Sequence, residues 1–250
     1  MKRILRIVRR VGLLLVLLVA GTALLAGFLR RQGWILLPHE AAPSQWEVFG
    51  VDVSAYQGDI DWPVLAGQQV QFAFIKASEG SSLQDRYFLR NWEGALQAGI
   101  RPGAYHFFSY DSPGHTQAEN FIRIVPPTPG ALPPVVDLEF YGSYLQEPKD
   151  RAEVEPELRA LLDRLEAYYG VKPILYVTYR SYQLYLSGGG YSQYPIWFSS
   201  PLVAPLGHAW SFWQYSHSAR LEGYHGTQER IDLNVFAGNR SQFESFGLPG

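Results

Sequence analysis

The alternation of strand patterns with helical patterns is the feature that most constrains the fold of this chain. Five runs of strand length are rich in aromatic and β-branched residues, and stretches of helical character separate them. The strand runs are 49–54, 72–78, 102–108, 133–140 and 173–179, and the helical stretches are 62–69, 85–98, 116–125 and 155–169. Strand and helix repeated in this order predict parallel strands joined by right-handed crossovers.

The last third of the sequence departs from this rhythm. Three further strand runs, 195–200, 210–216 and 230–236, are separated by only 9 and 13 residues, whereas a crossover with a helix needs about a dozen residues plus turns. Eight strand candidates in all predict an α/β fold, a (β/α)8-like TIM-type barrel that is lopsided, with few or no helices between the last three strands. An open doubly wound sheet is the structural alternative.

The N-terminus differs sharply from the remainder. Residues 11–29 are uncharged and mostly apolar, and as a helix they would be about 28 Å long, close to the hydrocarbon thickness of a bilayer. The positive-inside rule then predicts a single-pass cell-membrane protein with a cytoplasmic N-terminus and its domain on the periplasmic or extracellular side. A signal that is cleaved to release a secreted protein is the alternative. The predicted segments are 1–10 (cytoplasmic, basic), 11–29 (transmembrane helix), 30–48 (linker), 49–240 (catalytic domain) and 241–250 (tail).

Charge and composition exclude several function classes for the exported part. Beyond residue 31 there are 14 basic and 23 acidic residues, a net charge of −9, so nucleic acid is not an expected partner. The absence of cysteine rules out a disulfide framework, a thiolate metal site and a cysteine nucleophile. Neither a zinc-protease motif nor a serine-hydrolase elbow occurs. We expect no metal and no cofactor, and no obligate protein partner is evident.

The motif PVVDLEF (134–140) contains the most informative acids, Asp137 and Glu139. In a strand, residues two apart share a face, with Cα atoms roughly 6.5 to 7 Å apart. Two carboxyl groups this close raise one another's pKa, which keeps one of them protonated for general acid catalysis near neutral pH. The motif therefore suggests glycoside hydrolysis. Taken alone, it also fits two solvated acids at a strand end.

Other polar residues fall near the ends of predicted strands. They are Asp52, Lys76, His106 and Asp232. The C-terminal ends of the strands form the active-site face of such barrels. In a closed barrel the first and last strands are neighbours, so Asp52 and Asp232 would meet beside the acids of PVVDLEF. An open sheet would not guarantee this, and the convergence therefore depends on closure.

An ordered set of motifs resembles the glycoside hydrolase family 25 lysozymes, which are N-acetylmuramidases. The matching pieces span 50–238 and occur in the family's order. They are GVDVSAYQGDIDW (50–62), FAFIKASEG (72–80), the stretch 85–108, PVVDLEF, PILYVTY (173–179), WQYS (213–216) and IDLNVF (231–236). The resemblance implies an incomplete (β/α) barrel and cleavage of the β-1,4 bond between N-acetylmuramic acid and N-acetylglucosamine in peptidoglycan glycan strands.

Residue roles follow from the resemblance by motif match. Glu139 would be the general acid and later the general base, Asp137 its partner, and Asp52 and Asp232 the other site carboxyls. We hypothesise substrate-assisted retention, in which Asp137 holds the N–H of the sugar's 2-acetamido group. A chitinase-like N-acetylglucosaminidase and a non-catalytic, membrane-anchored glycan-binding protein are the rival functions. The chain departs from the pattern at Phe198, Ser199 and Ser200, where many relatives have an arginine or an aromatic residue.

Aromatic side chains near strand ends are candidates for sugar contacts, because flat apolar faces suit sugar rings. Of five such residues, including Tyr215, we expect two or three to line a groove. The predicted substrate-binding residues are Tyr105, Tyr176, Trp197, Trp213, Gln214, Lys76 and Glu79. Lys76 and Glu79 could instead form an ion pair at the barrel mouth. For His106, a structural, hydrogen-bonded role is favoured over a catalytic one.

Overall fold

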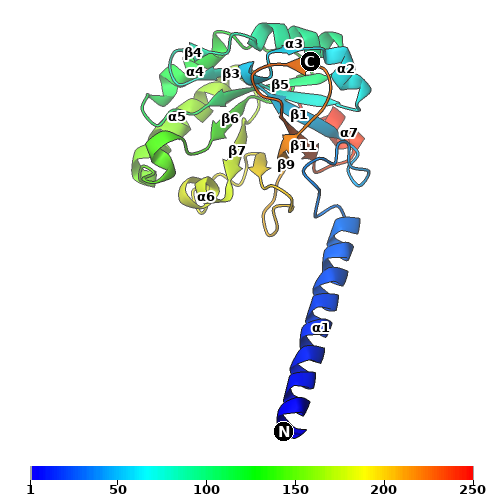
Figure 1. Cartoon of the computed structure of the whole chain (residues 1–250). Coiled ribbons are helices and arrows are strands. Elements are labelled where there is room, and N and C mark those ends of the chain that lie inside the picture. The colour runs from blue at the N-terminus through cyan, green and yellow to red at the C-terminus, as the bar shows by residue number, and fades with distance from the viewer. Residues whose placement is uncertain (1, 250) are drawn as a thin grey trace.

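The computed structural model describes residues 2–249, with side chains from Arg6 onward, and its main body is a closed barrel (Figure 1). The sheet order is β1-β11-β9-β8-β7-β6-β5-β3-β4, and β1 also pairs with β3, which closes the ring. An open sheet is thereby excluded. The barrel strands are β1 (Phe49–Val53), β3 (Phe72–Glu79), β5 (Arg101–Phe107), β6 (Val135–Leu138), β7 (Ile174–Thr178), β8 (Ile196–Ser199), β9 (Phe212–Ala219) and β11 (Ile231–Phe236).

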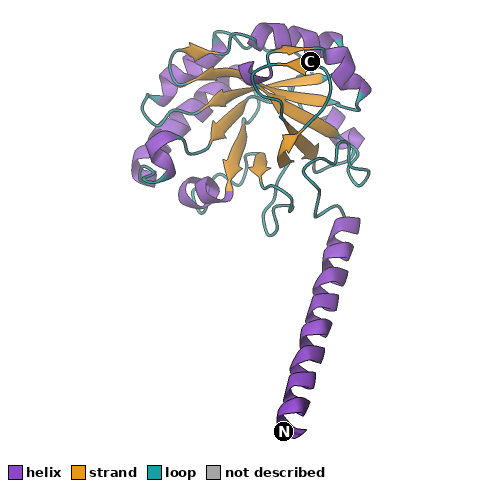
Figure 2. Cartoon of the chain, in the orientation of Figure 1, coloured by secondary structure: helices purple, strands orange, loops and turns teal. Residues whose placement is uncertain are grey.

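The helices cover only part of the barrel, as the sequence predicts (Figure 2). The helices between β1 and β7 are α2 (Trp62–Gly67), α3 (Phe88–Gln97), α4 (Gly114–Ile122) and α5 (Arg151–Tyr169), with 3-10 turns at Ala55–Gln57 and Gly142–Leu145. A short α6 (Tyr179–Ser181) and a π-helix (Tyr182–Leu186) follow β7. From β8 to β11 the described residues contain no helix, and the small pieces β2 (Asp59–Ile60), β4 (Leu83–Gln84) and β10 (Tyr224–His225) complete the fold.

Helix α5 shows how the local sequence sets an element's limits. Asp150 and Glu153 form a capping box at its start, and Gly170 ends it in the left-handed conformation at φ 73°. Between these signals, leucines at helical spacing are fully buried against the barrel and α4. These leucines are Leu158, Leu161, Leu162 and Leu165. Burial of each one contributes about 1.5 to 3 kcal/mol to the stability of the folded state.

The last strand, β11, runs antiparallel to both of its neighbours, β1 and β9. A regular barrel of this class would have it parallel, so the lopsidedness extends to strand direction. Because β11 is reversed, its first residues lie beside the C-terminal ends of the parallel strands. Asp232 therefore reaches the active-site face from the start of its strand, opposite Asp52 in the ladder.

The barrel interior is packed with aromatic rings below the active-site face. Phe74 stacks on Trp197 with ring centroids 4.3 Å apart, and Phe72 and Phe212 complete the layer. Helix α7 (Arg240–Glu244) closes the opposite end of the barrel and buries Phe243 against Phe72. The C-terminal segment, expected as a tail, thus contributes to the core through Phe243 and Leu248.

The N-terminal helix α1 (Lys2–Arg31) extends away from the barrel (Figure 1). Its stretch Arg6–Arg31 is long and apolar enough to cross a membrane, and the most apolar 18 residues within it have a mean hydropathy of 2.5. The following residues, expected as a linker, are packed on the barrel rather than free. Leu36 is buried, Tyr215 donates a hydrogen bond to the carbonyl of Glu40, and Trp46 contacts Trp213.

Candidate active site

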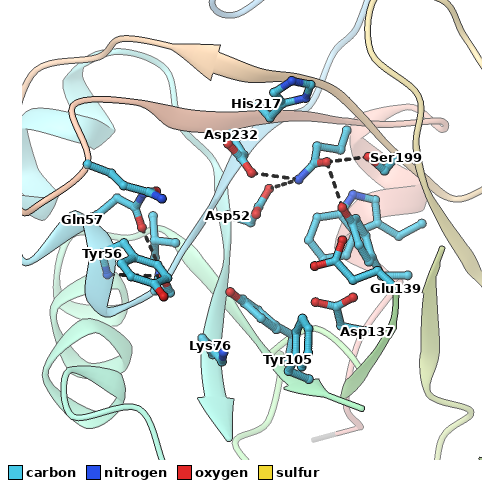
Figure 3. A pocket seen from close by; sticks show the side chains of 17 residues that line it. Asp52, Tyr56, Gln57, Lys76, Tyr105, Asp137, Glu139, Ser199, His217 and Asp232 are labelled. Carbon is cyan, nitrogen blue, oxygen red and sulfur yellow. Dashed lines mark hydrogen bonds between the residues drawn. The ribbon is translucent and has the colours of Figure 1, made fainter. Parts of the chain in front are cut away.

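A cavity of about 370 Å³ opens at the C-terminal ends of the parallel strands (Figure 3). Its size is suited to a sugar ring with its substituents. All four acids predicted from the sequence line it: Asp52 from β1, Asp137 from β6, Glu139 just after β6, and Asp232 from β11. Closure of the barrel brings these three separate stretches of chain together.

Asp137 and Glu139 form the first acid pair, and they lie close together on one side of the cavity (Figure 3). Burial, and then the charge of Glu139, raise the pKa of Asp137 well above its usual value. Burial, and then the charge of Asp52, raise the pKa of Glu139 to about 7, while Lys76 opposes this shift. Atom Oδ1 of Asp137 is buried without a hydrogen-bond partner among the described residues. The pair holds a proton near neutral pH and presents one free acceptor atom.

Asp52 and Asp232 form the second acid pair, across the β1–β11 ladder. Burial raises the pKa of Asp52 to about 6, against hydrogen bonds from Asn234 and Gln214 that lower it. Burial and the charge of Asp52 raise the pKa of Asp232 to about 9. Near pH 7, Asp232 therefore carries a proton and Asp52 is the more ionised member. The two groups share roughly one negative charge.

The side chain of Gln214 holds the second pair in place. Its Nε2 donates to Oδ2 of Asp52 at 3.0 Å and to Oδ2 of Asp232 at 3.2 Å. Its Oε1 accepts from the hydroxyls of Tyr176 at 3.0 Å and Ser199 at 2.9 Å. All four bonds require one orientation of the amide, so Gln214 is fixed between hydroxyl donors and carboxyl acceptors. Figure 3 shows this network at the cavity wall.

Three of the predicted aromatic residues line the cavity: Tyr105, Tyr176 and Trp197. Trp197 donates from Nε1 to Asn234 at 2.8 Å, and Asn234 in turn donates to Asp52 at 2.7 Å. Each polar tip is thus connected to the acid network or directed at the cavity. Three of the five aromatic residues thus line the cavity, in agreement with the expectation of two or three.

The structure contradicts the prediction that Trp213 contacts substrate. Trp213 is fully buried on the outer side of β9, where its Nε1 donates to the carbonyl of Ser200 at 2.7 Å. Successive residues of a strand point to opposite faces. Because Gln214 faces the cavity, Trp213 must face away from it. Tyr215 is likewise buried outside the cavity, next to Trp213.

Lys76 lines the cavity, whereas Glu79 does not. The two side chains form an ion pair at 2.8 Å, and the Lys76 ammonium lies 4.8 Å from the centroid of the Phe107 ring. Glu79 thus lies outside the cavity, in the ion pair with Lys76 that was the alternative to a substrate contact. Lys76 supplies positive charge near both members of the first acid pair.

His106 is a buried structural residue, as favoured from the sequence. Its Nδ1 lies 2.7 Å from the hydroxyl of Ser78, and its Nε2 lies 3.0 Å from Oε1 of Gln117. The Gln117 amide donates to two backbone carbonyls, so its oxygen faces the histidine and Nε2 carries the proton. Burial lowers the pKa of His106 to about 4. A neutral ring with both nitrogens engaged is not a proton shuttle for this cavity.

Sequence reasoning missed several residues of the site. Ser199 was noted only as a departure from the family pattern, and Asn234 only as part of a motif. Both lie two positions from a predicted site residue on the same strand, so the alternation of faces could have revealed them. The outer rim comes from different elements: Tyr56 and Gln57 lie in the 3-10 turn after β1, His217 lies on β9, and Gln228 lies in the loop before β11. Alternation along a strand could not reveal the residues of the turn and the loop.

The arrangement provides what glycoside hydrolysis needs. One carboxyl with a pKa near 7 can donate a proton to a leaving oxygen, and neighbouring carboxylates can stabilise positive charge at an oxocarbenium-like centre. The aromatic and amide side chains around them can position a sugar ring. A cavity designed only for binding would not require buried acids with raised pKa values.

Comparison with known proteins identifies the same group of enzymes. Residues 51–224 match the model of the glycosyl hydrolases family 25. A family 25 glycosyl hydrolase from Bacillus anthracis is 49% identical, with a TM-score of 0.78 over 84% of this chain and 98% of that one. A bacterial lysozyme from Streptomyces coelicolor is 29% identical, with a TM-score of 0.71 over 80% and 96% of the two chains.

A curated relative supports the same assignment. Lysozyme M1 of Streptomyces globisporus is 30% identical over 214 residues, which are 78% of this chain and 69% of that protein. The family match, the relative and the solved structures agree with the motifs and with the acids in the barrel mouth. The chain belongs to glycoside hydrolase family 25 and is a glycoside hydrolase of the lysozyme type.

Proposed function

We propose that this protein is an N-acetylmuramidase that cleaves the β-1,4 bond between N-acetylmuramic acid and N-acetylglucosamine in peptidoglycan. The observation that carries the proposal is the convergence of four carboxyl groups in one sugar-sized cavity, with Glu139 holding a proton near pH 7. Peptidoglycan-cleaving activity is consistent with the lysozymes that this chain resembles.

In the proposed first step, Glu139 donates its proton to the glycosidic oxygen as the bond from that oxygen to the anomeric carbon breaks. The carbonyl oxygen of the sugar's own 2-acetamido group attacks the anomeric carbon from the opposite face and forms an oxazolinium ion. In the second step, the Glu139 carboxylate removes a proton from water and the water oxygen attacks the anomeric carbon. The bond from that carbon to the oxazolinium oxygen breaks, which restores the neutral acetamido group and leaves Glu139 protonated. Two displacements at one carbon retain its configuration.

Asp137 would act by accepting the N–H of the acetamido group. Its Oδ1 is buried and has no partner among the described residues, so an incoming N–H would satisfy it. Burial raises the pKa of Asp137 well above its usual value as long as no donor reaches Oδ1. An N–H donated to its carboxylate would lower that pKa, and a proton held by Glu139 further favours the ionised form of Asp137. That charge state suits both roles at once, since Asp137 then stabilises the positive charge that develops on the acetamido nitrogen.

Asp52 and Asp232 would act on the other side of the sugar ring. The charge of Asp52 helps to raise the pKa of Glu139, and the Gln214 and Asn234 amides fix the position of the Asp52 carboxyl group. We assign this pair to binding sugar hydroxyls or water and to maintaining the pKa of the acid.

We further propose that α1 anchors the enzyme in the cell membrane, with the barrel on the periplasmic or extracellular side. The support is the apolar stretch of α1, its exposure to solvent in the isolated chain, and the basic residues that precede it.

The test is mass spectrometry of fragments released from purified peptidoglycan after borohydride reduction. A muramidase leaves reduced N-acetylmuramic acid at the new end, and the Glu139→Gln variant should release almost none. Reduced N-acetylglucosamine at the new end, or equal release by the variant, would contradict the assignment. Chitin oligomers in a parallel digestion separate a chitinase-like activity from this one.

A further inference from the structure

The stretch 181–219 contains no Asp, Glu, Lys or Arg, although the exported part as a whole is strongly acidic. It includes β8, the loop that follows it, and β9. The loop exposes three large apolar side chains to solvent, with exposed fractions of 41% for Leu202, 40% for Val203 and 49% for Leu206. The proposed chemistry does not use them. Exposed apolar clusters of this kind commonly mark an interaction surface.

This loop is attached to the end of the N-terminal helix by backbone hydrogen bonds. The amide of Leu36 donates to the carbonyl of Leu202 at 2.9 Å, and the amide of Ala204 donates to the carbonyl of Trp34 at 2.8 Å. Ile35 and Val203 form an antiparallel bridge between them. Trp34, with 46% of its surface exposed, adds an aromatic ring beside the loop.

The junction between α1 and this surface is ordered. The amide of Trp34 bonds to the carbonyl of Leu29, and Gly33 adopts the left-handed conformation at φ 74°, which is the Schellman arrangement of a helix end. Arg30 also pairs with Glu40 at 3.5 Å. The helix and the loop are thus held in one arrangement, and the loop tip lies at the level where α1 begins its course away from the barrel (Figure 1).

We propose that Trp34, Leu202, Val203 and Leu206 form a lipid-contacting surface that rests on the outer leaflet of the membrane beside α1. This inference depends on the anchoring role of α1 proposed above. If α1 spans the bilayer up to Arg30 and Arg31, the next residues lie in the interfacial zone, where Trp is enriched. An uncharged surface enters that zone without the repulsion that anionic lipids exert on acidic residues.

The backbone of Leu202 supports a role for its side chain. Leu202 has φ 73°, a conformation that glycine or asparagine adopts more easily. Holding a leucine there costs about 1 kcal/mol or more. The conformation directs an apolar side chain to the surface, where it gains little from the protein itself. Transfer into lipid offsets that cost.

The surface would also set the position of the active site relative to the membrane. The loop begins directly after Ser199, which lines the catalytic cavity. The strands β6 and β7 point with their C-terminal ends toward the side of the barrel from which α1 departs (Figure 1). The enzyme would therefore act on glycan strands close to the membrane.

Site-directed spin labelling of the full chain in vesicles of phosphatidylglycerol and phosphatidylethanolamine tests the proposal, because the protein has no native cysteine. We would label Leu206→Cys in the surface, Leu17→Cys in α1, and Leu89→Cys on α3 as a matched exposed leucine on the far side of the barrel. Retained activity on soluble glycan fragments confirms that each labelled protein is folded.

The proposal predicts that labels at positions 17 and 206 collide several-fold more often with oxygen than with a water-soluble nickel complex, and that position 89 shows the reverse. A lipid-exposed position 17 with an aqueous position 206 would overturn the surface and leave the anchor intact. An aqueous position 17 would overturn both. A label at 206 shielded from both reagents would show a protein partner instead of lipid, and would also refute the proposal. None of these outcomes bears on the identity of the bond cleaved.

Discussion

The two acid pairs of the cavity differ in how the fold supports them. Asp52 and Asp232 lie where β1 meets β11, the last strand of the part of the barrel without helices, and the amides of Gln214 and Asn234 hold them. Asp137 and Glu139 lie at the end of β6, in the regular half, and Oδ1 of Asp137 has no partner among the described residues. The held pair is suited to fixing charge and geometry, and the unsatisfied pair to changing protonation and bonding during a reaction.

Removal of the proton donor should have the largest effect. Glu139→Gln keeps the shape but cannot donate a proton, so we expect kcat to fall by at least about 10² to 10⁴-fold, the range typical of general acid catalysis. Turnover of purified peptidoglycan measures this. Glu93→Gln, an exposed acid on α3, is the matched control and should retain parental turnover. Parental activity in the Glu139 variant would contradict the distinction between the two pairs.

Replacement of Asp137 should have a comparable effect by a different route. Asp137→Asn removes the negative charge expected to accept the acetamido N–H, and we expect a loss of about 10² to 10³-fold in kcat, the size of a lost preorganised electrostatic contact. NMR analysis of the first-formed product anomer distinguishes the mechanism in the parent enzyme. Retention fits the acetamido role, whereas inversion would exclude it.

Loss of the amide support should have a smaller effect that depends on pH. Gln214→Met keeps the length of the side chain but removes the hydrogen bonds that lower the pKa of Asp52. We expect about a tenfold loss of kcat/KM, because unpairing buried groups here costs on the order of 1 to 3 kcal/mol. The acidic limb of the pH profile should move to higher pH, because the pKa of Asp52 rises when these hydrogen bonds are lost. Gln97→Met, at an exposed position on α3, is the control and should keep the parental profile. An unchanged profile in Gln214→Met would show that the amide network does not tune the pKa values of the pair.

The held pair should also make stability depend on pH. The pKa of Asp232 is raised from 3.8 to about 9 in the folded protein. The folded state therefore keeps its proton where the unfolded state has lost it, and stability falls as pH rises from about 4 toward 9. Asp232→Asn removes this contribution. Between pH 5 and pH 9, the Tm of the parent should fall further than the Tm of this variant. The difference between the two decreases should be about 3 °C or more. Parallel Tm curves would refute the assignment.

The smallest catalytic effect is expected at Trp213, on the outer face of β9. Trp213→Phe loses packing and the hydrogen bond to Ser200, at a cost of about 1 to 3 kcal/mol in stability. Its kcat/KM should match that of the parent. Trp197→Phe, inside the cavity, should raise KM because it also releases Asn234. Equal kinetic effects from both would mean that the two faces of the sheet are not functionally distinct.

Much of the site was predictable because it depends on local pattern and on closure. Apolar runs ending in acids predicted the strand ends, and the position of first and last strands in a barrel predicted that Asp52 meets Asp232. The direction of β11 was not predictable, since alternation along a strand is the same in either direction. The choice between Trp213 and Gln214 depended on register, and a shift of one residue exchanges the faces. The docking of 32–48 depends on tertiary contacts of Leu36 and Trp46 that no local pattern encodes.

The most direct test of Glu139 as the proton donor is a carbon NMR titration of the protein labelled at glutamate side-chain carboxyls, with the Glu139 resonance identified by its loss in Glu139→Gln. We expect a midpoint for Glu139 near pH 7, and activity that declines as pH rises through that value. A midpoint near 4.5, the ordinary value for a glutamate, would mean that the acid is ionised at neutral pH and that another group donates the proton.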